Sequence, residues 1–247
     1  MILTIAAKEL RALFASPLAW VVLAFLQVIL GWILVTRLDA FITVQSQLMQ
    51  METPPGITEI VVAPIFGAAA VVLIMAVPLL SMRLIAEERR NQTMTFLISA
   101  PLSMTQIVIG KFVGLYSFLM LSVALILAMA ASMYLGGRLD LGLLGTLSLG
   151  LALLIAAFAA VGVFFSSLTA QPVVAATATL ATLLGLWLLN MSQANPDSPF
   201  LMLALIRRYE SFTKGLIDTG DIIFLVVFTA VFLILAIRRL DSDRLGG

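Results

Sequence analysis

The densest group of polar and charged residues in the chain is residues 83–111, which read RLIAEERRNQTMTFLISAPLSMTQIVIGK. This segment lies between two long apolar runs that contain no charged residue. Pro101 interrupts it, because the residue before a proline is driven out of helical geometry. Ser103 and Gln106 then form the pattern of a capping box that opens a new helix. A polar insert of this kind is suited to contact with a soluble partner.

Residue types that usually catalyse reactions or bind metals are scarce. The sequence has no Cys and no His, which excludes thiolate ligands, disulfides and imidazole bases. The chain has no GxxxxGK[ST] phosphate loop, since Gly110-Lys111 is followed by Phe112. The pair Met49 and Met51 is better explained by apolar packing than by copper binding. We therefore expect no catalytic residue, no metal and no cofactor bound by this chain.

The composition is that of a membrane protein. Hydrophobic residues make up 62% of the chain and charged residues 11%, whereas a soluble domain has about 25% charged residues to face water. The net charge of +1 gives no electrostatic argument for nucleic-acid binding. The sequence predicts an all-α, polytopic membrane protein with a single domain over residues 1–247.

Six membrane-spanning helices are predicted, because a span needs roughly 20 apolar residues. The longest charge-free run divides at Pro172, which is well placed to start a helix. None of the spans contains Asp, Glu, Lys, Arg or His except at the two ends of the last one, where Asp221 and Arg238 are expected at the membrane interfaces. This argues against a stand-alone ion-coupled carrier. Small residues such as Gly150 and Gly162 predict close internal helix packing, with a dimer seam as the alternative. The predicted spans are about 18–36, 61–82, 112–135, 142–165, 173–191 and 221–238.

The distribution of Lys and Arg predicts the orientation. Inner segments of membrane proteins carry the excess of these residues, so both termini are expected in the cytoplasm. The inner side then holds Lys8, Arg11, Arg83, Arg89, Arg90, Lys111, Arg238, Arg239 and Arg244, and the outer side holds Arg37, Arg138, Arg207, Arg208 and Lys214.

Two amphipathic segments are predicted to lie along the membrane surfaces. Residues 2–16 have apolar residues at near-helical spacing and end at Pro17, which predicts an interfacial elbow helix. Residues 192–220 contain FLMLALIRRYESFTKGLID, which predicts an outer interfacial helix before the sixth span. Its polar residues either face an exit path or outer partner, or serve only as an interfacial anchor and helix cap; they are Arg207, Arg208, Tyr209, Glu210, Asp218 and Asp221.

The segment 83–111 is also predicted to contain a transverse helix over residues 92–99. A helix joined rigidly to two spans can transmit a push from a docked soluble protein. The alternative is a solvated inner loop that is basic only because inner loops are basic. The apolar cluster at Phe96, Leu97 and Ile98 argues against that alternative.

Segment 83–111 resembles the signature of ABC-2 type transporter permeases, (A)EE(R/K)RxxTxxxLLxxPxxxxxxxxGK, which forms a cytoplasmic coupling helix in that family. The later RRYESFTKGLIDTGDIIF resembles the branch associated with gliding motility and nitrous-oxide-reductase maturation. SSLTAQPVVAA also fits that branch, except that Ala170 stands where the usual motif has Asn. The resemblance covers essentially the whole chain.

The resemblance implies a non-hydrolytic permease subunit in a bacterial inner membrane. A separate cytoplasmic ABC ATPase would bind ATP and Mg, and its hydrolysis would drive export of a substrate or conformational signalling. Further expected partners are a second permease chain, identical or different, membrane lipid and a periplasmic protein. The alternative is a membrane scaffold or assembly factor without a motor. The residues expected to contact the ATPase or shape the coupling segment are Glu87, Glu88, Arg89, Arg90, Thr93, Thr95, Phe96, Leu97 and Pro101.

Overall fold

The computed structural model describes residues 1–48, 56–94, 103–135, 139–191 and 204–245. The chain is mostly helical in these ranges, and they contain no strand. Six helical segments within them are long and apolar enough to cross a membrane, which confirms the predicted all-α class with six spans. The segments are Pro17–Gln45, Thr58–Arg90, Met104–Ser132, Leu141–Leu168, Pro172–Leu189 and Thr219–Arg244.

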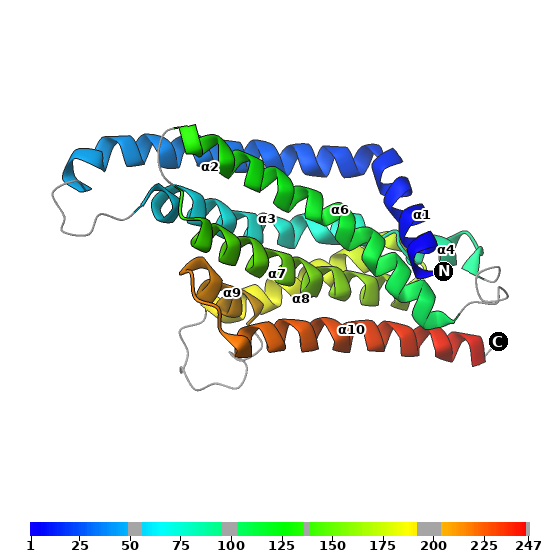
Figure 1. The fold of residues 1–247 in the computed structure, drawn as a ribbon. Helices are drawn as coiled ribbons and strands as arrows, with labels where there is room; N and C mark the ends of the chain where they lie inside the picture. Colours follow the sequence, from blue (N-terminus) through cyan, green and yellow to red (C-terminus); the bar gives the residue numbers. More distant parts are fainter. Residues whose placement is uncertain (49–55, 95–102, 136–138, 192–203, 246–247) are drawn as a thin grey trace.

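The long helices lie side by side in one elongated bundle (Figure 1). The short helix α4 and both ends of the chain lie at one end of this bundle, and α9 lies at the opposite end. We call these the α4 end and the α9 end. The elements in order are α1 Ile2–Ala15, α2 Pro17–Leu48, the π-helical turn η1 Thr58–Val62, α3 Ala63–Ser81, α4 Ala86–Arg90, α6 Met104–Ser132, the short 3-10 turn η2 Met133–Leu135, α7 Leu141–Leu168, α8 Pro172–Met191, α9 Leu205–Thr213 and α10 Thr219–Leu245.

Helix α7 is the centre of the bundle and packs against α3, α6, α8, α9 and α10. Two glycines allow these close approaches. A Cβ at Gly150 would lie 2.6 Å from the Phe212 Cβ on α9, and one at Gly162 would lie 2.5 Å from the Ser81 Cβ on α3. The predicted internal packing by small residues is therefore confirmed at these two positions.

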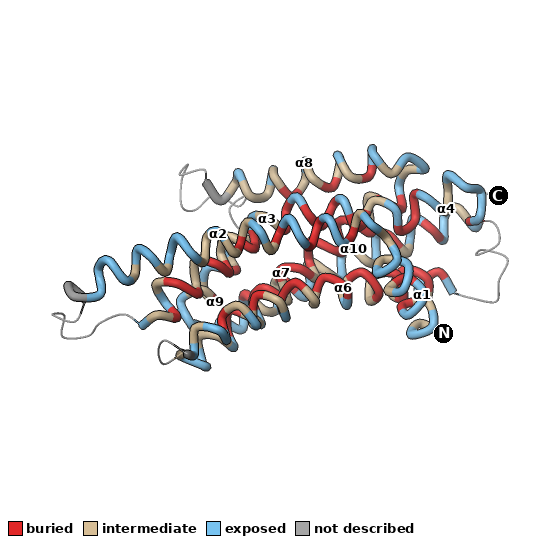
Figure 2. The backbone as a smooth tube through the Cα atoms, turned by 90° about the horizontal axis from the view of Figure 1, so that it is seen from above, coloured by how far each residue is buried: buried red, intermediate tan, exposed pale blue. Residues whose placement is uncertain are grey.

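The outer helices leave apolar side chains on the surface of the bundle. Buried residues line the facing sides of α3, α6 and α7, whereas much of α2 and α8 is exposed (Figure 2). Phe25 and Trp32 on α2 are among the large exposed apolar side chains. A continuous apolar exterior is unfavourable in water and favourable in a bilayer, which agrees with a multi-pass membrane protein.

Three helices continue beyond the predicted spans. Helix α2 runs to Leu48, although the first span was expected to end at residue 36. Helix α6 begins at Met104, where the capping box was predicted to open it, so Lys111 lies about two turns inside the helix although the span was expected only from residue 112. Helix α10 continues to Leu245. A helix satisfies its backbone hydrogen bonds internally, so it need not end where the apolar run ends.

Local signals predicted several boundaries correctly. Ser103 Oγ accepts a hydrogen bond from the Gln106 backbone N–H at 3.2 Å, and the Gln106 side chain accepts one from the Ser103 N–H, which is the predicted capping box. The amphipathic N-terminal helix ends before Pro17, and α8 begins at Pro172. These boundaries depend on neighbouring residues only, which is why the sequence reveals them.

The transverse helix that was expected over residues 92–99 does not begin at residue 92. The helical piece is α4, over Ala86–Arg90, and Gln92 has φ +57°, in the left-handed region that ends a helix. Glu87 and Glu88 stand at the N-terminus of α4 and two arginines at its C-terminus, the arrangement that the helix dipole favours. A following helix cannot start before Met94, and residues 95–102 lie outside the described residues.

Candidate functional site

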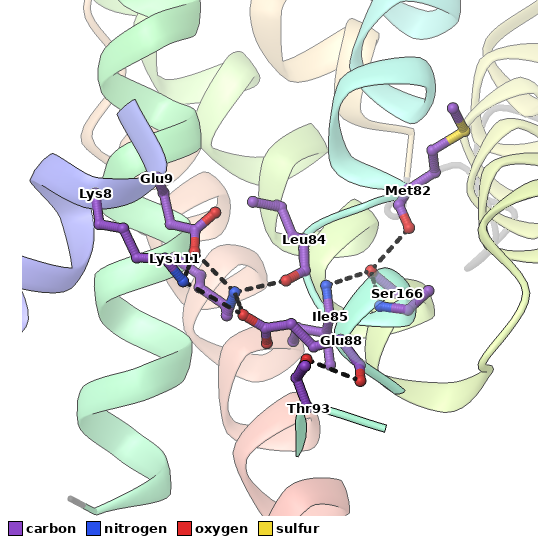
Figure 3. Close-up of polar contacts among 10 residues, drawn as sticks. Lys8, Glu9, Met82, Leu84, Ile85, Glu88, Thr93, Lys111 and Ser166 are labelled. Carbon is purple, nitrogen blue, oxygen red and sulfur yellow. Dashed lines mark hydrogen bonds and ion pairs between the residues drawn. The ribbon is translucent and has the colours of Figure 1, made fainter. Parts of the chain in front are cut away.

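The break between α3 and α4 is held by the end of α7. Ser166 Oγ accepts hydrogen bonds from the backbone N–H groups of Ile85 at 3.0 Å and Ala86 at 3.1 Å. The same hydroxyl donates to the Met82 carbonyl at 3.1 Å (Figure 3). Backbone groups at a helix break must find partners elsewhere. The buried Ser166 hydroxyl therefore provides hydrogen-bond partners for backbone groups on both sides of the break, and it connects α4 to the central helix α7.

A buried group of ion pairs joins α1, α4 and α6 (Figure 3). The Lys111 ammonium on α6 donates to Glu9 Oε1 on α1 at 2.9 Å and to Glu88 Oε1 on α4 at 2.7 Å. Its third bond goes to the Leu84 carbonyl at 2.6 Å. Lys8 lies 3.7 Å from Glu9 and 3.8 Å from Glu88. We call Lys8, Glu9, Glu88 and Lys111 the charge cluster.

The charge cluster is balanced, with two ammonium groups facing two carboxylates. The Lys111 side chain is only 2% exposed, so its three N–H donors need partners inside the protein, and three acceptors surround it. Losing one member of such a buried pair costs about 3–5 kcal/mol, because the other charge is left uncompensated. The charge cluster therefore specifies how α1, α4 and α6 lie relative to one another.

Two glycines bring α1 and α6 close enough to form the charge cluster. A Cβ at Gly110 would lie 2.7 Å from the Ile5 Cβ, and one at Gly114 would lie 2.8 Å from the Glu9 Cβ. Gly110 and Gly114 are four residues apart, the spacing that lets membrane helices approach each other closely. Larger residues at these positions would move Glu9 away from Lys111.

Helix α4 also contacts the last helix. The guanidinium of Arg89 forms an ion pair with the carboxylate of Asp243 near the end of α10. Arg239 lies 3.5 Å from the other oxygen of Asp243, one turn away on the same helix. The side chains of Arg89 and Asp243 are 17% and 25% exposed, so this contact is largely shielded from water. With Ser166 and the charge cluster, α4 is linked to α1, α6, α7 and α10.

The predicted ATPase-contacting residues divide into three groups. Glu88 and Arg89 point inward, into the charge cluster and toward α10. Glu87, Arg90 and Thr93 are exposed, and Glu87 lines a cleft beside α1. The remaining predicted residues lie outside the described residues; they are Thr95, Phe96, Leu97 and Pro101.

At the other end of the molecule, α9 is joined to the start of α10. Arg208 donates to Asp221 Oδ1 at 3.0 Å, and the Ser211 hydroxyl donates to Asp221 Oδ2 at 2.6 Å. Asp221 is 4% exposed. The Asp218 side chain caps α10 by accepting from the Gly220 N–H at 2.7 Å. This predicted segment therefore contains the helix cap that the sequence suggested.

The rest of the predicted outer segment is split between surface and interior. Arg207 and Glu210 are exposed. Tyr209 is 1% exposed, and its hydroxyl has no hydrogen-bond partner among the described residues. Burial raises the pKa of this hydroxyl well above its ordinary value of 10.0. Helix α9 thus packs on the bundle through its apolar face, and its predicted place at the outer interface stays a prediction.

Sequence reasoning missed several residues of the site. Lys111 was predicted only as an inner-side cation and not as part of the site, although Gly110-Lys111 ends the signature-like segment 83–111. The place of Lys111 at the end of this segment was the signal in the sequence that could have indicated its role. Glu9, Ser166 and Asp243 gave no local signal, because each acts on a residue far away along the chain. In the described part of the chain no group of three His, Cys, Asp or Glu side chains gathers, and the expectation about metals stays a prediction.

The fold and site define a class of protein: a multi-pass, all-helical membrane protein whose short polar helix is linked to several spans at one end of the bundle. The sequence model of the family described as ABC-2 family transporter protein matches residues 3–245. The chain therefore belongs to the ABC-2 transporter family, as the resemblance predicted. No curated protein matches the chain. The branch suggested by the outer segment stays a prediction.

Proposed function

We propose that this chain is the membrane subunit of an ABC transporter and that it converts ATP hydrolysis by a separate cytoplasmic ATPase into movement of its own helices. The observation that carries the proposal is the set of links on α4. Helix α4 is short and lies at the end of the bundle, yet it is bound to α1 and α6 through Glu88, to α7 through Ser166 and to α10 through Arg89. A force on α4 therefore acts on four helices together.

In this mechanism the ATPase docks on the exposed side of segment 83–111. Arg90 and Thr93 are exposed there, and the sequence continues with the apolar run from Phe96 to Ile98, residue types that a protein groove can bind. Glu88 and Arg89 do not need to touch the ATPase. Their role is to pass its movement to the spans, because both are paired with other helices.

The complex proposed is two permease chains with two ATPase chains, in which ATP and Mg are bound by the ATPases. The α4 end faces the cytoplasm, because it holds Lys8, Arg11, Arg83, Arg89 and Arg90 and basic segments stay inside. The apolar surfaces of the spans fit an amphipathic substrate, exported away from the α4 end. The bacterial inner membrane is the proposed location, and a periplasmic protein at the α9 end is a further proposed partner.

Co-purification tests the proposal. The chain is expressed with the ABC ATPase encoded beside its gene, and ATPase retained on the tagged permease is measured together with its hydrolysis rate. We expect Arg90→Glu and Phe96→Ala to reduce the retained ATPase about tenfold, the effect of losing a central contact of roughly 1.4 kcal/mol. Arg11→Glu, at the same end but outside the segment, is the matched control.

The charge cluster gives a second, distinct result. Glu88→Gln should leave ATPase retention near that of the unaltered chain and change the stimulation of hydrolysis by the permease, because the contact remains while its link to α6 is weakened. An unaltered permease that retains no ATPase, with or without nucleotide, would contradict the proposal and favour a scaffold without a motor.

A further inference from the structure

A cleft lies at the α4 end, where α1, the start of α2 and the junction of α3 with α4 meet. It is an open cleft of about 150 Å³. Five of the lining residues are leucines, among them Leu18 on α2 and Leu80 on α3. Three further lining residues are charged, Glu9, Arg83 and Glu87, and the remaining two are Ala12 and Ser16.

The described residues do not neutralise all the charges of the cleft. Glu9 faces Lys8 and Lys111 in the charge cluster. Arg83 and Glu87 are both exposed, and the side chains of the described residues provide neither with an ion-pair or hydrogen-bond partner. Among the described residues, the cleft therefore has one guanidinium and one carboxylate without a charged partner. A complementary ligand carries an anionic and a cationic group close together.

The position of the cleft indicates that its ligand also has an apolar part. Leu18 and Leu80 lie in the apolar helices α2 and α3, whereas Arg83 and Glu87 follow the last residue of α3, in the polar end of the segment Thr58–Arg90. The cleft therefore crosses the boundary between the apolar spans and the polar end of the bundle. A lipid at a membrane surface has this arrangement, with its head group outside and its acyl chains along the apolar residues.

We propose that this cleft binds a phospholipid with a primary ammonium in its head group, of the phosphatidylethanolamine class. Arg83 holds the phosphate through charge-assisted hydrogen bonds, Glu87 accepts from the ammonium, and the leucines contact an acyl chain. A choline head group cannot donate hydrogen bonds to Glu87, and a glycerol head group leaves this carboxylate without a cation. Because Glu9 lines the same cleft, the bound lipid lies directly beside the charge cluster.

Native mass spectrometry of the purified, delipidated full-length chain tests this site without an ATPase. The probes are phosphatidylethanolamine, phosphatidylcholine and phosphatidylglycerol with identical acyl chains, and glycerophosphoethanolamine, which has no acyl chains. We expect the ethanolamine lipid to bind about tenfold more tightly than the other two lipids, because one charge-assisted hydrogen bond is gained. Glycerophosphoethanolamine should bind far more weakly, because it leaves the leucines uncovered.

Substitutions of the charged lining residues test which side chain contacts which part of the lipid head group. Arg83→Gln should weaken binding of the ethanolamine lipid about tenfold, and Arg83→Lys should restore most of it by keeping the charge. Glu87→Gln should remove the preference for ethanolamine over choline while leaving choline binding unchanged. Arg11→Gln, which removes a cation from α1 outside the cleft, should have no effect. Equal binding of the three lipids, or equal effects of the Arg83 and Arg11 variants, would overturn the proposal; tight binding of glycerophosphoethanolamine would replace the lipid with a soluble ligand.

Discussion

The Lys111 ammonium on α6 lies 2.7 Å from the Glu88 carboxylate on α4, although the two residues are 23 positions apart in the sequence. This pair changes the interpretation of segment 83–111. The charges of an ordinary inner loop are all solvated. Those of this segment are not, because the Glu88 side chain is 15% exposed and the Lys111 side chain 2% exposed. The inward charges hold α4 in place, and the outward ones remain free for partners.

Replacing Lys111 should destabilise the protein strongly. Lys111→Met leaves the carboxylates of Glu9 and Glu88 facing each other without their buried cation, at an expected cost of about 3–5 kcal/mol. Unfolding of the purified protein by a titration with sodium dodecyl sulfate measures the change. Combining Lys111→Met with Glu9→Gln and Glu88→Gln should recover part of the loss. Equal stability of Lys111→Met and the unaltered chain would show that the charge cluster does not hold these helices.

The close approach of α1 to α6 can be tested by adding a single methyl group. Gly114→Ala places a Cβ 2.8 Å from the Glu9 Cβ and 3.0 Å from the Ala6 carbonyl oxygen, and such overpacking typically costs about 1–3 kcal/mol. Gly145→Ala is the matched control on α7, because a Cβ there meets nothing within 4 Å. Alanine favours a helix interior over glycine by up to about 1 kcal/mol, so the control should be neutral or stabilising. If both variants unfold alike, the predicted clash is absent.

The contact between α4 and α10 should depend on Arg89 more than on Arg239. Arg89 and Asp243 are both largely shielded, whereas the Arg239 side chain is 42% exposed and belongs to the same helix as Asp243. A double-mutant cycle of Arg89→Gln and Asp243→Asn should give a coupling energy of about 1 kcal/mol or more. The cycle with Arg239→Gln should give between about 0 and 0.5 kcal/mol. The opposite order would mean that Asp243 does not anchor α4.

The hydroxyl of Tyr209 should be dispensable for folding. It is buried without a hydrogen-bond partner among the described residues, and an unsatisfied buried polar group costs about 1 kcal/mol or more. Tyr209→Phe should therefore leave stability unchanged or raise it by about that amount. Loss of stability in this variant would indicate a hidden partner for the hydroxyl.

Alkaline pH gives an independent test of the same residue. The folded-state pKa of Tyr209 is raised above the ordinary value of 10.0, so the unfolded chain releases this proton first. The contribution to stability is complete below pH 10.0 and declines as pH rises above it. The difference in stability between the unaltered chain and Tyr209→Phe should change in this alkaline range and stay constant at lower pH.

Orientation can be measured by cysteine labelling, since the natural chain contains no Cys. Arg90→Cys at the α4 end and Lys214→Cys after α9 are both exposed positions. A membrane-impermeant maleimide added to intact cells should label Lys214→Cys alone, and Arg90→Cys should react only after the membrane is opened. Labelling of Arg90→Cys in intact cells would reverse the proposed topology.

The sequence predicted those features that depend on composition or on neighbouring residues. The six apolar segments, the Ser103 cap and the break at Pro172 follow from patterns a few residues long. The inward direction of Glu88 does not, because it requires Lys111 on another helix and Glu9, which is 102 residues from Lys111. Arg89 and Asp243 are 154 residues apart. Charges paired over such distances look the same in a sequence as charges in solvent.

Helix α10 carries an anchor at each end. It is an unbroken helix of 27 residues, about 40 Å long at 1.5 Å per residue. Asp221 fixes one end to Arg208 on α9, and Asp243 fixes the other to Arg89 on α4. A stiff helix that is anchored at both ends moves as one piece. A tilt or rotation imposed on one end is therefore transmitted to the other end, at the opposite membrane face.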